Sequence, residues 1–230
     1  MEHTLSENCR IIAVGDIHGC LFSLQHLLEQ LELQSDDQLV FLGDYIDRGP
    51  RSREVIDFLL ELQKRFACFF IKGNHEVMYL QYLENRDPVT WFYNGGQATL
   101  RSYASSRGLD FPEEHLDFLR NGRFYIETEN YFFTHGGLDP ELSVRDNLRY
   151  YKPEEFCWQR LHMRTSFLES KRYPWEKTLV CAHTPVPKPL LLERLIAIDT
   201  GCVYHNNPLL GRLTAVILPS RQLLQTENLD

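Results

Sequence analysis

The chain has 230 residues, of which 43% are hydrophobic and 12% aromatic, so it can build one domain with a sizeable core. A formal net charge of −8 argues against a general nucleic-acid-binding surface, and no segment approaches the ~20 consecutive apolar residues that span a bilayer. The polar residues 1–10 do not form a secretory signal, and the six cysteines form no CxxC pair. We therefore expect a single domain over residues 1–230, in a cytoplasmic monomer with reduced thiols and no membrane or nucleic-acid partner.

The first part of the chain alternates short apolar runs with helical periodicity. Strands are predicted at residues 10–14, 38–42 and 67–71. A helix is predicted at residues 21–33, and a second one follows Ser52 as its N-cap. Each apolar run ends at a glycine that an acid or an amide follows, in Gly15-Asp16, Gly43-Asp44 and Gly73-Asn74. This β-α-β-α-β order is typical of a largely parallel sheet with functional loops at its carboxyl edge.

Residues 77–125 differ from this pattern, because they are rich in aromatic and polar residues with helical periodicity. We interpret them as a helical insertion packed on the sheet beside its active edge. Later elements are predicted as strands at residues 123–127, 131–134, 178–182, 195–199 and 213–218, with a helix around 153–163. The Pro-rich and Gly-rich turns between these strands indicate an antiparallel or mixed second sheet. The polar tail, residues 220–230, is predicted to be poorly ordered.

Candidate metal ligands lie in glycine-flanked loops at the predicted strand ends. They are Asp16, His18, Asp44, Asn74, His135 and His183. In an extended loop, Asp16 and His18 would point the same way and ligate one ion, while Asp44 could bridge two ions. Oxygen and imidazole ligands suit Mn²⁺, Fe or Zn²⁺ at catalytic sites, and two metals that share a carboxylate form the kind of site that activates water for attack on phosphorus. A single Asp or His at a strand end is more often structural, but these six together complete two half-sites.

Several sequence blocks resemble, in type and in order, the signature of the phosphoprotein phosphatase family. They are Gly15-Asp16-Ile17-His18-Gly19, Gly43-Asp44-Tyr45-Ile46-Asp47-Arg48-Gly49, Gly73-Asn74-His75-Glu76 and His135-Gly136-Gly137. The resemblance extends from residue 10 to residue 218 and is nearest to small bacterial and phage lambda-type serine/threonine protein phosphatases. It implies an α/β fold of the calcineurin-like metallophosphoesterase type, in which two packed mixed β-sheets are flanked by helices as an α-β-β-α sandwich.

The resemblance implies how the ligands are divided between two divalent ions. One ion is held by Asp16, His18 and the bridging Asp44, and the other by Asp44, Asn74, His135 and His183. A hydroxide that bridges the two ions attacks phosphorus in line. Mn²⁺ is the expected metal, with Fe or Zn²⁺ as alternatives.

Catalytic and phosphate-binding residues are implied in the same way. His75 is similar to the general acid that protonates the leaving alkoxide, and Asp47 to its partner, because a carboxylate bonded to an imidazole fixes its tautomer. Arg48 and Arg160 are similar to phosphate-binding arginines, whose planar fork matches phosphate oxygens. The phosphate site also includes Asn74 and Lys72.

Two positions depart from the family pattern, and two features are left open. Lys72 stands where close relatives carry arginine, so it supplies charge but no bidentate fork. Ala182 replaces a glycine before the last metal histidine, which is harmless unless the backbone needs a positive φ. The Asn94-Gly95-Gly96 turn either lines the cleft or is a plain turn under Trp91. Asp199 either supports the metal site or simply ends its strand.

The activity implied first is dephosphorylation of phosphoserine or phosphothreonine in a phosphoprotein or phosphopeptide. The alternative is a symmetrical diadenosine tetraphosphate hydrolase, a bis(5'-nucleosyl)-tetraphosphatase, which shares most of the site. Those enzymes tend to carry Asp at the position of Glu76. They also tend to have a degenerate block at the position of Asp47-Arg48. Glu76 and the intact Asp47-Arg48 pair therefore favour the protein phosphatase.

Other classes fit the sequence less well. Cyclic-nucleotide phosphodiesterases and related nucleases usually carry a second histidine where this chain has Pro185. No cysteine is followed six residues later by arginine, which excludes a cysteine-based phosphatase. A catalytically dead binding module would have lost ligands or the acid, whereas this chain retains all six ligands, His75 and Asp47.

Overall fold

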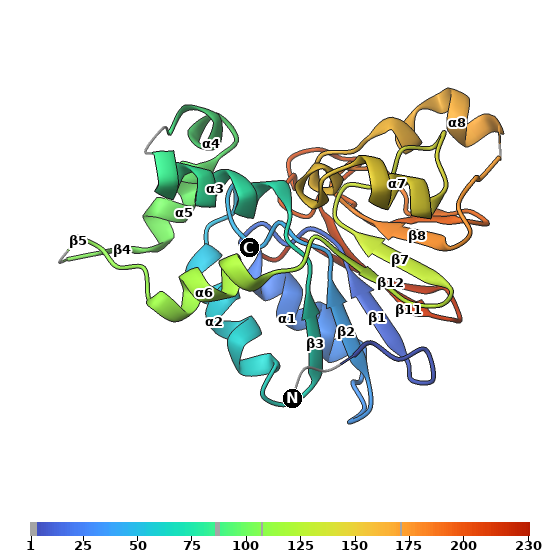
Figure 1. The fold of residues 1–230 in the computed structure, drawn as a ribbon. Helices are drawn as coiled ribbons and strands as arrows, with labels where there is room; N and C mark the ends of the chain where they lie inside the picture. Colours follow the sequence, from blue (N-terminus) through green and yellow to red (C-terminus); the bar gives the residue numbers. More distant parts are fainter. Residues whose placement is uncertain (1–3, 86–87, 107, 171) are drawn as a thin grey trace.

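Two five-stranded sheets pack face to face, with helices on both outer faces (Figure 1). The computed structural model describes residues 4–85, 88–106, 108–170 and 172–230. Buried apolar side chains form three layers, one between the sheets and one beneath the helices on each outer face. This arrangement confirms the predicted α-β-β-α sandwich.

The first sheet has the strand order β12-β11-β1-β2-β3. Its parallel part consists of β1 (Ile11–Val14), β2 (Gln38–Phe41) and β3 (Ala67–Phe70). Strand β11 (Arg212–Leu218) runs antiparallel to β1. The predicted parallel β-α-β-α-β unit is therefore confirmed, as the central part of a mixed sheet.

Side chains of β1 alternate between two apolar layers, as strand geometry requires. Ile12 and Val14 belong to the layer under α1 (Leu21–Gln30) and α2 (Ser52–Leu62). The other two residues of the strand face the second sheet. Because both faces of β1 are covered, its sequence is a continuous apolar run rather than an alternation of apolar and polar residues.

The C-terminal segment differs from its prediction. Residues 222–227 form β12 (Gln222–Glu227), which pairs antiparallel with β11. Leu223 packs on the layer between the sheets and Leu224 on the layer under the helices. The prediction of a poorly ordered tail is wrong, because two leucines on opposite faces of a mostly polar strand attach it to both layers.

The second sheet has the order β6-β7-β8-β10-β9. Its strands are β6 (Tyr125–Glu127), β7 (Tyr131–Thr134), β8 (Thr178–Cys181), β9 (Leu190–Leu191) and β10 (Leu195–Ala197). Strands β7, β8 and β10 are parallel, whereas β6 and β9 are antiparallel edge strands. The predicted mixed second sheet is confirmed.

Helices α7 (Val144–Tyr150) and α8 (Thr165–Ser170) cover the outer face of the second sheet (Figure 1). The single helix predicted around residues 153–163 is wrong. Two short 3₁₀ helices, Pro153–Cys157 and Leu161–Met163, take its place. Trp158, with a φ of −114°, caps the end of the first helix, and Arg160, with a φ of −134°, caps the start of the second, so the segment is not one continuous helix.

The stretch predicted as a helical insertion is mostly helical. It contains α4 (Val89–Tyr93), α5 (Gly96–Ser102), the hairpin of β4 (Ala104–Ser105) and β5 (Gly108–Leu109), and α6 (Glu113–Asn121). Helix α3 (Asn74–Asn85) begins earlier, directly after β3, so the Asn74-His75-Glu76 block forms the first turn of a helix. Figure 1 shows α3, α4 and α5 above the first sheet. Among the described helices, none combines the length and apolarity that a membrane span requires.

Candidate metal centre

The predicted site residues converge where the parallel strands of both sheets end. The six candidate ligands follow β1, β2, β3, β7 and β8, and all of them are buried: Asp16, His18, Asp44, Asn74, His135 and His183. The carboxyl ends of parallel strands lie at one edge of a sheet, and here the edges of two packed sheets meet. The fold therefore collects six polar side chains from distant parts of the sequence.

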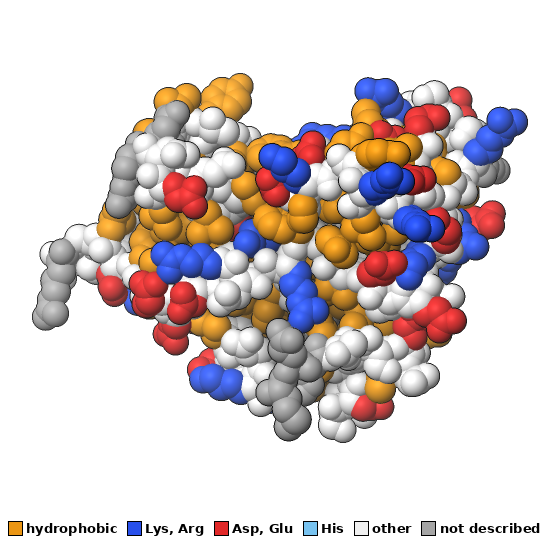
Figure 2. Space-filling model, viewed as in Figure 1, with side chains coloured by type: hydrophobic (Ala, Val, Ile, Leu, Met, Phe, Trp, Pro, Cys, Tyr) orange, Lys and Arg blue, Asp and Glu red, His pale blue; other side chains and the backbone are white. Residues whose placement is uncertain are grey.

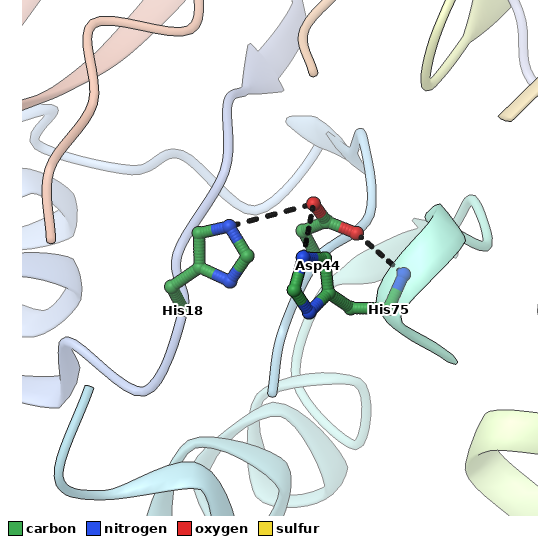
Figure 3. Close-up of side chains that lie close together, drawn as sticks. All are labelled: His18, Asp44 and His75. Atoms are coloured by element: carbon green, nitrogen blue, oxygen red, sulfur yellow. Dashed lines mark hydrogen bonds and ion pairs between the residues drawn. The ribbon is translucent and has the colours of Figure 1, made fainter. Parts of the chain in front are cut away.

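Asp44 lies at the middle of this cluster. Its Oδ2 is 3.4 Å from Nε2 of His18, 3.3 Å from Nε2 of His135 and 4.0 Å from Nε2 of His75. Figure 3 shows the imidazoles of His18 and His75 turned toward Asp44. Among the described residues, two groups of side chains could hold a metal, and Asp44 belongs to both, with His18 and His75 in one and with His135 and His183 in the other. This shared position is what a bridging carboxylate requires.

Backbone carbonyls set the tautomers of two of the histidines. His18 Nδ1 lies 2.9 Å from the carbonyl of Ile46, and His135 Nδ1 lies 2.8 Å from the carbonyl of Leu42. With Nδ1–H donating to a carbonyl, Nε2 of each ring carries a lone pair, and that lone pair faces the Asp44 carboxylate. Between His135 Nε2 and Asp44 Oδ2, two electron-rich atoms 3.3 Å apart need a cation or a proton, whereas His18 Nε2 also has the Arg48 guanidinium 2.6 Å away.

The electrostatics of the cluster favour positive charge. Burial lowers the pKa of His135, but the carboxylates of Asp44 and Asp16 outweigh burial and raise the pKa to about 10. Burial raises the pKa of Asp44, but His135 and His75 lower it well below its usual range. The Asp44 carboxylate thus stays ionised in a buried pocket. A divalent cation would take the place of the His135 proton beside this carboxylate.

The ligands predicted for the second ion lie within hydrogen-bond distance of one another. His135 Nε2 is 3.0 Å from Asn74 Oδ1 and 3.0 Å from His183 Nδ1. Burial and the neighbouring His135 lower the pKa of His183 to about 2, so its imidazole stays neutral, as metal binding requires. With Asp44, these residues form a four-donor set.

Asp16 contacts members of this second set. Its Oδ1 is 3.7 Å from His135 Nδ1 and accepts a hydrogen bond from the backbone N–H of His183 at 3.3 Å. Burial and Asp199 raise its pKa well above the usual range. The extended-loop argument for Asp16 and His18 does not hold, because His18 has a φ of 47° and the chain turns there. The assignment of both residues to one ion stays a prediction.

Asp199 is buried beside this part of the site, and its support of the metal site stays a prediction. Its Oδ1 accepts a hydrogen bond from the Gly201 N–H at 2.8 Å, and its Oδ2 is buried without a partner among the described residues. Burial raises its pKa to about 6. Its carboxyl group interacts with Asp16, which it can help to orient.

His75, a member of the group with His18 and Asp44, also pairs with Asp47. His75 Nδ1 is 2.6 Å from Asp47 Oδ2, so the carboxylate fixes the tautomer of the ring. His75 Nε2 is buried and makes no hydrogen bond among the described residues. Asp47 also accepts hydrogen bonds from Trp91 Nε1, at 2.8 Å, and from Thr99 Oγ1, at 2.5 Å. His75 Nε2 thus has no hydrogen-bond partner among the described residues, while Asp47 fixes the orientation of the ring. This is the geometry of a proton donor to a bound substrate.

Glu76 has a structural role that the sequence did not reveal. Its carboxylate accepts hydrogen bonds from the N–H groups of Asp44, Tyr45 and Gly73, at 2.8–2.9 Å. Burial and Asp44 raise its pKa to about 7. Glu76 thus fixes the backbone of the β2 loop. Its oxygens contact backbone N–H groups, so Glu76 acts on the loop that carries Asp44 and not directly on a substrate.

Two arginines border the metal centre, and the predicted lysine does not. Arg48 Nη1 lies 2.6 Å from His18 Nε2, and Arg160 Nε donates to His183 Nε2 at 2.8 Å. Lys72 Nζ donates instead to the carbonyl of Arg120 at 2.9 Å and lies over the ring of Phe124. These contacts support the two arginines as phosphate ligands. The contacts of Lys72 with a backbone carbonyl and an aromatic ring are those of a structural residue.

Backbone geometry around the site is unusual. Positive φ values occur at Asp44, Asp47 and Arg48 in the β2 loop, and at His183. Such conformations cost energy and cluster at functional sites. A side chain at Gly73 would bring its Cβ within 2.1 Å of Asp44 Oδ1, so only glycine fits there. Ala182 is not among the described residues with positive φ, so alanine is harmless at that position.

The residues that sequence reasoning missed act over long sequence distances. Trp91 and Thr99 contact Asp47 from 44 and 52 residues away. Trp91 was associated only with the Asn94-Gly95-Gly96 turn, and Thr99 carried no local signal. The Asn94-Gly95-Gly96 turn packs against Trp91 through Gly96 and approaches Arg48 through Gly95. It therefore lies under the tryptophan and also borders the site.

The donor set fits two divalent cations held by carboxylate, amide and imidazole groups around a shared carboxylate. The choice of Mn²⁺ stays a prediction. With its two arginines and its oriented histidine, the arrangement is suited to the hydrolysis of phosphate esters or anhydrides. The fold and the site together define a metallophosphoesterase.

Comparison with known proteins agrees with this class. The family model described as calcineurin-like phosphoesterase matches residues 9–218, and the chain belongs to that family. The chain is 27% identical over 234 residues to bis(5'-nucleosyl)-tetraphosphatase PrpE (asymmetrical) of Oceanobacillus iheyensis, with 94% of this chain and 91% of that protein covered. It is 26% identical over 279 residues to the symmetrical bis(5'-nucleosyl)-tetraphosphatase of Nitrosospira multiformis, with coverage of 94% and 95%.

Solved structures have the same fold. A candidate diadenosine tetraphosphatase superposes with a TM-score of 0.72 at 24% identity, covering 99% of this chain and 97% of that chain. A protein serine/threonine phosphatase from Saccharomyces cerevisiae has a TM-score of 0.62 at 17% identity, with coverage of 98% and 82%. The expected nearness to lambda-type protein phosphatases is corrected by these comparisons, since the two curated relatives described above are named as bis(5'-nucleosyl)-tetraphosphatases.

Proposed function

We propose that this protein hydrolyses the polyphosphate chain of dinucleoside tetraphosphates such as diadenosine tetraphosphate. The observation that carries the proposal is the shared position of Asp44 between two metal-binding groups, beside an oriented histidine and two arginines. The full-length similarity to two kinds of bis(5'-nucleosyl)-tetraphosphatase supports this substrate over a phosphoprotein.

Each part of the site has a task in this reaction. Asp16, His18, Asp44, Asn74, His135 and His183 would hold two divalent cations. When bound, such ions lower the pKa of water to near neutrality and neutralise phosphate oxygens. Arg48 and Arg160, beside opposite members of the ligand set, can each bind two phosphate oxygens and so orient the polyphosphate chain.

His75 is placed to supply a proton to the leaving group. Asp47 holds the proton on Nδ1, so the proton to be transferred is carried by Nε2, the nitrogen without a partner among the described residues. A phosphate leaving group is a weak base and needs little protonation, whereas an alkoxide needs much more. His75 therefore matters less for a phosphoanhydride than for a phosphoserine ester.

This dyad is the specific observation that favours a second candidate, the serine/threonine protein phosphatase. A buried histidine with a carboxylate partner suits an alkoxide leaving group, and phosphoserine and phosphothreonine peptides supply one. Under this candidate the partner is a phosphoprotein or phosphopeptide.

A substrate panel tests the two candidates. Metal-replete enzyme with Mn²⁺ is assayed on diadenosine tetraphosphate, phosphoserine, phosphothreonine and phosphotyrosine peptides, and the products are separated by chromatography. The proposal expects a higher kcat/KM for the dinucleotide, and the products ADP alone or ATP with AMP identify the cleaved anhydride. A higher kcat/KM for a phosphopeptide would replace the proposal by the second candidate.

A further inference from the structure

A cavity of about 370 Å³ opens directly beside the metal centre. It is lined by Arg48, Tyr93, Asn94, Gly95, Val203 and Tyr204. Arg48 belongs to both places, because its Nη1 is 2.6 Å from the metal-ligand candidate His18 while its guanidinium carbon is 5.5 Å from the centre of the Tyr204 ring. A molecule held at the metal centre can therefore extend into this cavity past a single arginine.

Tyr93 presents an aromatic ring at the rim of this cavity. It is 91% exposed, whereas Trp91, two residues earlier on α4, is 1% exposed and packs in the core. Figure 2 shows hydrophobic side chains projecting at the top of the molecule over α4, and a hollow between these helices and those above the second sheet. A large ring that α4 places in solvent, at the edge of a cavity that leads to the site, is available for stacking on a ligand.

Tyr204 is held in place on the other side. Its backbone N–H donates to the Gly201 carbonyl at 2.8 Å, and its carbonyl accepts from the N–H of Asn207 at 2.9 Å. Its ring packs over the turn so closely that a Cβ on Gly201 would lie 3.0 Å from Tyr204 Cδ2. The ring is thus oriented before a ligand arrives, which lowers the entropy cost of stacking.

The Asn94-Gly95 turn completes the cavity. The Gly95 carbonyl accepts a hydrogen bond from the Arg48 N–H at 3.3 Å, and a Cβ on Gly95 would lie 2.9 Å from Arg48 Cγ. Asn94 directs its Nδ2 to the carbonyl of Thr90, which leaves Oδ1 without a donor among the described residues. The lining of the cavity therefore includes two aromatic residues, a cation and an amide side chain.

We propose that this cavity binds the base of one nucleoside of the substrate, with Tyr93 and Tyr204 as stacking partners and Arg48 on the adjoining phosphate. Aromatic faces next to a cation are the common means of holding a nucleotide without strict base readout. Asn94 Oδ1 can accept a hydrogen bond from an exocyclic amino group such as that of adenine. This inference rests on the hydrolysis of dinucleoside tetraphosphates proposed above. It adds that the nucleoside base is the part of the substrate that the cavity recognises.

Tyrosine variants test the subsite by steady-state kinetics on diadenosine tetraphosphate with Mn²⁺. Tyr93→Ala and Tyr204→Ala are expected to raise KM roughly 5- to 150-fold with little change in kcat, the size expected for loss of a base–aromatic stack. Tyr93→Phe and Tyr204→Phe keep the rings and should keep KM. Tyr150→Ala, which removes an exposed tyrosine of α7, is the matched control and should leave KM unchanged. Melting temperatures verify that each variant is folded.

An inhibition experiment separates the subsite from the reaction. Adenosine 5'-monophosphate and inorganic phosphate are compared as inhibitors of p-nitrophenyl phosphate hydrolysis. The nucleotide should inhibit more strongly in the wild type, and this preference should disappear in both alanine variants. If the preference appears but diadenosine tetraphosphate is not hydrolysed, the subsite stands and the proposed function fails. If the dinucleotide is hydrolysed with an unchanged KM in both alanine variants, or if nucleotide and phosphate inhibit alike, the subsite is overturned.

Discussion

Trp91 donates its indole N–H to the carboxylate of Asp47, at 3.0 Å from Oδ1 and 2.8 Å from Oδ2. Asp47 in turn holds Nδ1 of His75 at 2.6 Å. A helix of the insertion thus reaches the proton donor of the site through one buried carboxylate. The insertion orients the catalytic apparatus in addition to bordering it.

Replacing Trp91 tests this coupling. Trp91→Phe removes the indole donor but leaves an aromatic ring, and we expect kcat to fall roughly 10- to 100-fold, as for other losses of a supporting hydrogen bond. The loss should be larger for a phosphoserine peptide than for p-nitrophenyl phosphate, whose leaving group needs less protonation. Trp175→Phe is the control, since it removes an indole bond to the Asp139 carbonyl. An equal loss of kcat in both variants would mean a general effect on folding.

His75→Asn removes the proton donor itself. We expect kcat for phosphomonoesters to fall roughly 10²–10⁴-fold, the usual contribution of a general acid. The metal content, measured by mass spectrometry of the purified protein, should remain that of the wild type. His75 Nε2 lies 4.0 Å from Asp44 Oδ2, close enough for His75 to be a metal ligand. The metal content of the variant therefore distinguishes a ligand from an acid. A variant that loses metal as well would make His75 a ligand and not an acid.

Asp44→Asn should weaken both metal sites, because one carboxylate oxygen lies within 3.3–3.4 Å of histidines from both sets. Titration calorimetry with Mn²⁺ on the EDTA-treated protein should show two binding events in the wild type. Both binding events should be weaker in the variant. In the wild type, EDTA should abolish the activity and added Mn²⁺ should restore it. Asp57→Asn, at a half-exposed position on α2, is the control. Two intact sites in Asp44→Asn would contradict the bridging role.

The stability of the second sheet should depend on pH through His162. Burial lowers the pKa of this residue from 6.5 to about 4, and its Nδ1 has no partner among the described residues. Between these two values the unfolded chain binds a proton that the folded chain does not, so stability falls as the pH falls from 6.5 to 4. The loss from this group is about 3 kcal/mol.

Denaturant unfolding of the metal-loaded protein at several pH values between 4 and 7 measures this effect. The uncharged variant His162→Leu should show a flatter dependence over the same range. A variant curve parallel to that of the wild type would exclude His162 as the cause.

Asp230 should stabilise the fold from the end of the chain. Its carboxylate accepts hydrogen bonds from the N–H groups of Phe22 and Ser23 in the first turn of α1, and lies 3.2 Å from Arg51. Asp230→Ala should lower the free energy of unfolding by about 1–2 kcal/mol, as for loss of an N-cap. Chemical denaturation measures it, with Asp36→Ala at an exposed position as the control. Equal stability of the two variants would contradict the capping role.

Local patterns in the sequence predicted much of the fold. The apolar run at residues 131–134 coincides with β7, and the parallel strands of the first sheet lie where the runs before Gly15, Gly43 and Gly73 place them. These patterns are informative because a strand buried on both faces must be apolar throughout. The strand β12 was missed since its polar residues carry no such signal, and its stability comes from Leu223 and Leu224 on two layers.

The residues of the candidate metal centre could be predicted from local patterns, because Asp44, His135 and their companions lie in glycine-flanked loops at strand ends. It also determined the His75–Asp47 pair through the resemblance to a known family. The packing of distant elements placed Asp44 between two ligand sets, brought Asp16 to the backbone N–H of His183 and brought Trp91 to Asp47. The reason is physical: local patterns report which face of an element is buried, whereas distances between side chains depend on how the two sheets and the insertion pack.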